Sequence, residues 1–90
     1  MIIHGLQWDD NNLEHIIVGH RIQPVEVEDI CFGRHYAISA KYSRKALYGQ
    51  AESGRYLMII LERLKDAVYR PITARNMTVA ERRKYKEIMG

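Results

Sequence analysis

The sequence predicts a small α+β domain, a single domain over residues 1–90, and three observations support this prediction. Ninety residues suit one domain with one core. Helix signals lie toward both ends of the chain, whereas residues 34–75 show the alternation typical of strands. The expected order is a strand, two N-terminal helices, three or four antiparallel strands and a C-terminal helix. The result would be an antiparallel sheet of about four strands in a two-layer domain.

The N-terminal part should contain one strand and two helices. An opening strand is expected over residues 2–8. Asp9 or Asp10 can cap a first helix that runs to about Val18, where a glycine follows. A second helix is expected over residues 24–33, because a proline suits its first turn and a glycine its end.

The middle of the chain should form the sheet. A strand is expected near residues 44–50, followed by a turn and a second strand over residues 55–63. That second strand is apolar at both alternating sets of positions, which predicts a central strand covered on both faces. A further strand over residues 67–75 contains Pro71, which lacks a ladder donor and so predicts an edge position or a bulge.

A capping box, in which Thr78 and Glu81 satisfy each other's backbone N–H, should start the last helix, which runs to about residue 89. Glu81 could instead pair with Arg75, which ends the preceding strand. Tyr85 falls on the same helix face as Glu81 and is most simply a core aromatic residue with its hydroxyl at the rim.

Charge is distributed unevenly along the chain. Residues 1–33 carry a net charge of −5, whereas the remaining residues carry +8. A basic body favours a polyanionic partner, although a solvated basic surface has the same composition. The longest apolar run has six residues, too few to span a membrane, and no signal segment is visible. A lone Cys31 cannot form an internal disulfide, so a cytoplasmic location is expected.

Two histidines, His15 and His20, lie in the segment EHIIVGHR. Five residues along an α-helix is about 500°, so the side chains should diverge by about 140°, and Gly19 should break the helix between them. No carboxylate or thiol cluster completes a metal site, so none is expected. Proton transfer and phosphate contact are the functional alternatives. A plain surface role for His15 and a loop-orienting role for His20 are the structural ones.

Four segments carry a resemblance to a known family. They are Trp8-Asp9, Gly19-His20-Arg21-Ile22, residues 44–57 with R-x-A-x-x-G and G-R-x-L, and residues 73–85 with T-A-R followed by T-x-x-E-R-x-x-Y. On these segments nearly the whole chain resembles the BrnT family of bacterial type II toxins, small ribonucleases of RelE-like fold. The family's K-H-G-(V/I) loop is matched only in part, because the lysine is absent and Arg21 replaces the glycine.

This resemblance implies metal-independent RNA cleavage without a cofactor, restrained by a cognate antitoxin. Such an antitoxin usually carries a ribbon-helix-helix DNA-binding domain, so operator DNA would be bound only through it. We expect His15 or His20 to transfer protons, Arg44 and Arg75 to clamp the phosphate, and Tyr85 to orient the reacting groups. The further residues expected to contact RNA are Arg55, Arg63, Glu81 and Arg82.

Two other readings remain open from the sequence. The altered loop around His20 is compatible with a catalytically silent module that keeps the fold and binds a partner protein. Direct DNA binding is less favoured, because the sequence has no helix-turn-helix or zinc motif.

Overall fold

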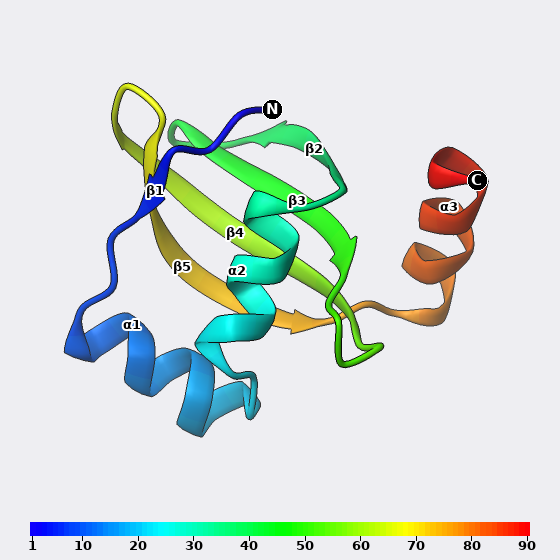
Figure 1. Cartoon of the computed structure of the whole chain (residues 1–90), viewed down its shortest axis with the longest axis horizontal. Coiled ribbons are helices and arrows are strands. Elements are labelled where there is room, and N and C mark those ends of the chain that lie inside the picture. Colours follow the sequence, from blue (N-terminus) through cyan, green and yellow to red (C-terminus); the bar gives the residue numbers. More distant parts are fainter.

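A five-stranded sheet in the order β1-β5-β4-β3-β2 organises the computed structural model, which describes residues 1–90 (Figure 1). The strands are β1 (Gly5–Leu6), β2 (His35–Ala40), β3 (Arg44–Gln50), β4 (Tyr56–Lys65) and β5 (Val68–Asn76). The helical segments are α1 (Asp10–Glu14), the π-helical turn η1 (His15–Gly19), α2 (Pro24–Phe32) and α3 (Val79–Met89). The predicted α+β class is confirmed, with one strand more than expected.

The first strand differs from its prediction in length and direction. It has two residues and runs parallel to the start of β5, so the sheet is mixed rather than wholly antiparallel. The strand is short because Asp9 turns the chain into α1. Its carboxylate accepts a hydrogen bond from the Asn12 N–H at 2.9 Å, and the Asn12 side chain accepts one from the Asp9 N–H at 2.8 Å.

Helices α2 and α3 begin and end where the capping residues in the sequence predict. α2 opens with a proline and closes at Gly33. At the start of α3 the Thr78 hydroxyl accepts from the Glu81 N–H at 3.1 Å, and the Glu81 carboxylate accepts from the Thr78 N–H at 2.8 Å. The other end of α3 is tied to the sheet, because the Arg34 guanidinium donates to the Met89 carbonyl.

One core lies between the sheet and the helices α1 and α2. Its fully buried members are Ile16, Ile22, Val27, Ile30, Leu47, Leu57, Ile59, Leu61 and Ala74. Three of these, at alternate positions, come from β4, while Met58 on the opposite face of that strand is also buried. The prediction that β4 is covered on both faces is therefore confirmed only in part, because on the second face Tyr56 and Ile60 are half-buried. None of the helices is long and apolar enough to cross a bilayer.

A bulge accommodates Pro71 inside the sheet. β5 has neighbours on both sides, but β1 ends opposite Tyr69, so no strand faces the missing N–H of the proline. The register with β4 shifts between Ile60 and Leu61, which leaves Ile72 as the extra residue. The predicted bulge is confirmed.

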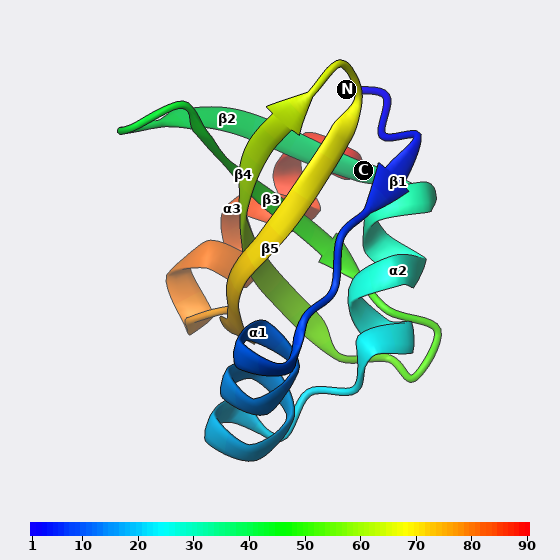
Figure 2. The same ribbon diagram turned by 90° about the vertical axis from the view of Figure 1, so that its left-hand side faces the viewer.

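The face of the sheet opposite α2 has no helix over its middle (Figure 2). We call it the open face, and the cross-strand register places three rows of side chains on it. The rows are Tyr36, Tyr48, Met58 and Arg75; Ile38, Ala46, Ile60 and Thr73; and Ala40, Arg44, Glu62 and Arg70. In the middle row Ile38, at the β2 end, is 50% exposed and Thr73, at the β5 end, is half-buried, whereas Ala46 between them is buried.

Candidate active site

His15 and His20 meet at one hydroxyl on the edge of the open face. The Nε2 atom of His15 lies 3.1 Å from Thr73 Oγ1, and that of His20 lies 3.4 Å from the same oxygen. The two rings are edge to face, with centroids 5.0 Å apart. The middle row of the open face therefore ends in two imidazoles and a hydroxyl. We call His15, His20 and Thr73 the histidine cluster.

The change from α to π winding brings the histidines together. In η1 the turn is wider than in an α-helix and its hydrogen bonds join residues five apart, which is the separation of His15 and His20. Gly19 belongs to this turn and does not break it. The predicted divergence of the two side chains was wrong for this reason. π-Turns within helices are frequent at functional sites.

A single hydroxyl proton imposes different roles on the two rings. Thr73 can donate one hydrogen bond and accept others, and a neutral imidazole has one protonated and one free nitrogen. When Thr73 donates to one Nε2, the other ring can bond the same oxygen only by donating from its own Nε2. The arrangement thus favours one free Nε2, the form that a base requires, beside one Nε2–H, which can serve as an acid when its ring is protonated on both nitrogens.

Arg75 lies two residues beyond Thr73 on the same face of β5, about 7 Å along the strand. Its guanidinium donates to both carboxylate oxygens of Glu81, at 2.7 and 3.0 Å, and also to the Asn76 carbonyl at 3.1 Å. The alternative prediction, a Glu81–Arg75 pair, is confirmed, and Glu81 keeps its capping role. Hydrogen bonding to Glu81 raises the pKa of Arg75, so this guanidinium is a permanent cation.

Acid should weaken this end of the molecule. Arg75 lowers the pKa of Glu81 to about 2, against the opposing effect of burial and with help from the Thr78 N–H. Because the pKa is lower in the folded protein, the stabilisation is complete above about pH 4.5 and disappears as the pH falls toward 2. Arg75 is 40% exposed, so solvent screening reduces the expected contribution to about 1 to 2 kcal/mol.

Denaturant unfolding of the wild type and Glu81→Gln at pH 7 and pH 3 measures this contribution to the free energy of unfolding. The difference between the two proteins should shrink at the lower pH, and an unchanged difference would contradict the assignment.

Arg44 lies across the open face, two strands from the histidine cluster. Neighbouring strands are about 4.8 Å apart, so its backbone is about 10 Å from β5. Its guanidinium approaches Glu62 at 4.0 Å, and its Nε is buried without a hydrogen-bond partner. In the same row Arg70 pairs with Asp9 at 2.9 Å. Arg44 therefore has donor capacity to spare, whereas Arg70 is engaged.

Tyr85 belongs to a chain of aromatic rings that joins α3 to the open face. The ring of Tyr36 stacks on Tyr48 at 4.9 Å and on Tyr85 at 6.0 Å, and Tyr85 meets the edge of Tyr56 at 5.9 Å. Tyr85 is only 8% exposed, as expected for a core aromatic residue. Burial raises the pKa of the Tyr48 phenol, and the nearby Glu81 carboxylate raises it further.

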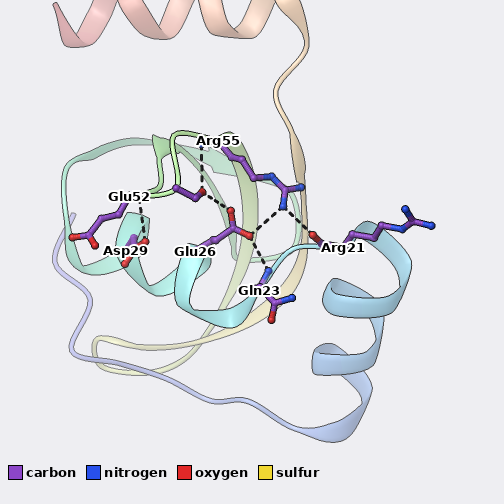
Figure 3. Close-up of polar contacts among 7 residues, drawn as sticks. Arg21, Gln23, Glu26, Asp29, Glu52 and Arg55 are labelled. Atoms are coloured by element: carbon purple, nitrogen blue, oxygen red, sulfur yellow. Dashed lines mark hydrogen bonds and ion pairs between the residues drawn. The ribbon is translucent and has the colours of Figure 1, made fainter.

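Arg55 is engaged in a network behind the turn between β3 and β4, which ties it to the residue after His20 (Figure 3). Its guanidinium donates to the Arg21 carbonyl at 2.9 Å and to Glu26 at 3.2 Å. Glu26, 5% exposed, also accepts from the Ser53 hydroxyl at 2.7 Å and the Gln23 N–H at 3.0 Å. Burial opposes ionisation of Glu26, yet these hydrogen bonds and the charge of Arg55 lower its pKa. The network fixes the turn onto α2.

The other two expected RNA-contacting arginines lie in different places. Arg63 is exposed near the β4–β5 hairpin, where it donates to the Asp66 carbonyl at 2.9 Å. It is five residues along β4 from Met58, the partner of Arg75, which corresponds to about 17 Å. Arg82 lies on α3, with its guanidinium carbon 4.4 Å from the centre of the Tyr56 ring. The structure therefore groups His15 and His20 with Arg75 but not with Arg63.

Sequence reasoning missed several residues of the open face. The sequence predicts Thr73 only as part of a motif and predicts no role for Tyr36 or Tyr48, because nothing in it distinguishes them from other strand residues. The register supplies the missing information, since it places Tyr48 in one row with Arg75. The structure contains no group of three or more His, Cys, Asp or Glu side chains arranged to hold a metal ion.

Comparison with known proteins supports the fold. The sequence matches no protein-family model and no curated protein. Among solved structures, the chain is similar to the Brucella abortus ribonuclease toxin BrnT, with a TM-score of 0.68 and 14% sequence identity. The match covers 82% of this chain and 96% of the toxin chain. The BrnT-like fold expected from the sequence is therefore confirmed.

Proposed function

We propose that this protein is an RNA-cleaving toxin of a bacterial toxin–antitoxin pair. One observation supports it most: a BrnT-like sheet carries two histidines on one hydroxyl, with a permanently charged arginine about 7 Å along the same strand. Cleavage of RNA by its own 2′-hydroxyl requires a base, an acid and positive charge at the phosphate. The open face offers all three groups.

The proposed reaction uses the two histidines in opposite senses. The ring with the free Nε2 removes the proton from the ribose 2′-OH, which attacks the adjacent phosphorus. The other ring, as an imidazolium protonated on both nitrogens, gives its Nε2 proton to the departing 5′-oxygen and becomes neutral, leaving a 2′,3′-cyclic phosphate and a 5′-hydroxyl. Arg75, with Arg44 from the far side of the face, offsets the charge that develops on the phosphorane. Acid–base catalysis contributes about 10² to 10⁴ in rate, and electrostatic stabilisation is commonly as large or larger.

The partner in this proposal is a cognate antitoxin with an acidic, amphipathic toxin-binding segment and a ribbon-helix-helix DNA-binding domain. Opposite charge on the inhibitor would steer its association with the basic body and cover the RNA site. Operator DNA would be bound by the antitoxin. The resemblance of the sequence to BrnT toxins and the matching fold support this assignment.

Incubation of the purified protein with a labelled RNA tests the proposal directly. We expect fragments with 2′,3′-cyclic phosphate and 5′-hydroxyl ends, formed at the same rate with and without a chelator, because none of the proposed steps uses a metal. A matched oligonucleotide with 2′-O-methyl groups should remain intact, since it lacks the attacking hydroxyl. No cleavage of any RNA, or cleavage of the methylated strand, would contradict the proposal.

The silent-module alternative has one observation in its favour. The guanidinium of Arg75 is already bound by both oxygens of Glu81, so a phosphate must compete with that carboxylate. Expression in bacteria separates the two readings. Growth arrest that disappears in a His15→Ala/His20→Ala variant supports the enzyme, whereas harmless expression of the wild type supports the module.

A further inference from the structure

A groove runs along the exposed side of α3, outside the histidine cluster. Two adjoining hollows of about 260 and 370 Å³ form it, and both are lined by Arg82. The first is lined by Val79, Arg82, Arg83 and Lys86, and the second by Gly54, Arg55, Tyr56, Asn76, Met77 and Arg82. We call these residues together the α3 groove. Its lining contains four cations and no carboxylate.

Two of these cations are held in place by one aromatic ring. The Arg82 guanidinium carbon lies 4.4 Å from the centre of the Tyr56 ring, and the Lys86 Nζ lies 5.3 Å from it. The edge contact with Tyr85 fixes Tyr56 in turn. Long basic side chains normally lose rotamer entropy when they bind, and this loss is smaller for side chains that are already ordered. The α3 groove is thus prepared for an anion.

The charge of the α3 groove is not neutralised within the molecule. The four ion pairs of the protein include Arg55, which is bound to Glu26, but not Arg82, Arg83 or Lys86. The acidic residue at the start of α3, Glu81, is committed to Arg75. Three exposed cations therefore face one groove without a partner.

We propose that the α3 groove binds the phosphodiester backbone of the RNA strand next to the bond that is cut, which rests on the proposed function of the open face. Asn76 lines the α3 groove and lies three residues beyond Thr73, about 10 Å along β5. The register puts Asn76 on the other face of β5 from Thr73 and Arg75, so a strand whose phosphate lies beside the histidines would pass Arg75 and turn round the end of β5 into the α3 groove. An acidic protein segment fits less well, because interface cores need apolar anchors. The first hollow has only Val79, and in the second Met77 is buried and Arg82 and Lys86 lie against the Tyr56 ring. Phosphate contacts carry no base information, so this binding is independent of sequence.

Fluorescence anisotropy with a 2′-O-methyl oligonucleotide measures this binding without cleavage. In Arg82→Ala/Lys86→Ala, affinity at physiological salt should fall about tenfold or more. The slope of log affinity against log salt should decrease by about 1.4, since each phosphate contact contributes about 0.7 for a single strand. The matched control is Lys41→Ala/Lys65→Ala, which removes the same charge from two exposed residues at the other end of the sheet, one in the β2–β3 turn and one at the end of β4. The control should lose less than threefold. A Tyr56→Leu variant keeps Arg82 and Lys86 but removes the ring that orders them, so its loss of RNA affinity should lie between those of the groove variant and the control.

Equal losses in the groove variant and its control, or no loss in either, would overturn the proposal, because binding would then reflect net charge or another surface. Poly-glutamate serves as a second probe. If the wild type binds poly-glutamate tightly and Arg82→Ala/Lys86→Ala does not, while both bind RNA with the same affinity, the α3 groove is a protein-binding surface and the proposal is wrong. Because the oligonucleotide is never cut, these outcomes do not depend on catalysis. Normal groove binding by a protein that cleaves no RNA would leave the groove assignment standing and remove the function proposed for the histidines.

Discussion

Replacing His15 and His20 together by alanine should slow RNA cleavage by about 10² to 10⁴ while leaving the protein folded. Both rings contact Thr73, and that contact is at the surface, so few buried interactions are lost. If one ring is the base and the other the acid, each single substitution should cost nearly as much as the double, because residues that act as a unit are not additive. Single-turnover rates of the three variants from pH 5 to pH 8 measure this.

His4→Ala provides the matched control. His4 is exposed near the start of β1, and its contact with the sheet is made by its backbone N–H, which donates to the Ala67 carbonyl at 2.8 Å. Removing this imidazole should change neither the rate nor its pH profile. Wild-type cleavage by the His15→Ala/His20→Ala double variant would exclude the histidines and leave the arginines as the only catalytic groups of the open face.

The fold was largely predictable because its boundaries are set by local chemistry. Pro24 and Gly33 mark the two ends of α2, and the capping box of Thr78 and Glu81 starts α3. Each of these signals acts within a few residues of the chain, so it can be recognised without knowledge of the tertiary structure. The run of β4 is apolar at both alternating sets of positions, and it forms a central strand that is fully buried on the α2 side and half-buried on the open face. The opening strand was predicted, but the short length and parallel pairing of β1 were not, since they depend on where β5 lies and not on its own two residues.

The candidate site was harder to predict from the sequence than the fold. The choice between α and π winding depends on how η1 packs beside β5, and no residue pattern predicts it. A difference in winding over one turn decides whether His15 and His20 diverge or meet. Thr73 joins them only because the bulge at Pro71 sets which face of β5 it occupies. The individual catalytic candidates were therefore visible in the sequence, and their association was not.

Arg75→Ala should lower the rate of RNA cleavage by about 10² to 10³, the usual effect of removing one group that stabilises charge in a transition state. Its guanidinium reaches the open face from the row beside Thr73, where it can meet a phosphate held by the histidines. The fold should survive, because the lost pair with Glu81 is half exposed and the capping box remains. Arg75→Lys keeps the charge but not the planar pair of donors, so it should restore only part of the rate.

Glu81→Gln separates catalysis by Arg75 from a purely structural role. Glutamine preserves the capping box while removing the charge that holds the guanidinium, so a phosphate no longer competes with a carboxylate. If Arg75 binds the phosphate, Glu81→Gln should cleave RNA at least as fast as the wild type, although it is slightly less stable. If Arg75 only anchors α3, both Arg75→Ala and Glu81→Gln should lose the same small amount of stability and leave the cleavage rate unchanged. Arg70→Ala calibrates the comparison, since Arg70 is also a β5 arginine paired with a carboxylate, that of Asp9. Its loss should reduce stability without the large fall in rate. A fall as large as that of Arg75→Ala would show that the rate reports the integrity of the sheet, and would remove Arg75 from the mechanism.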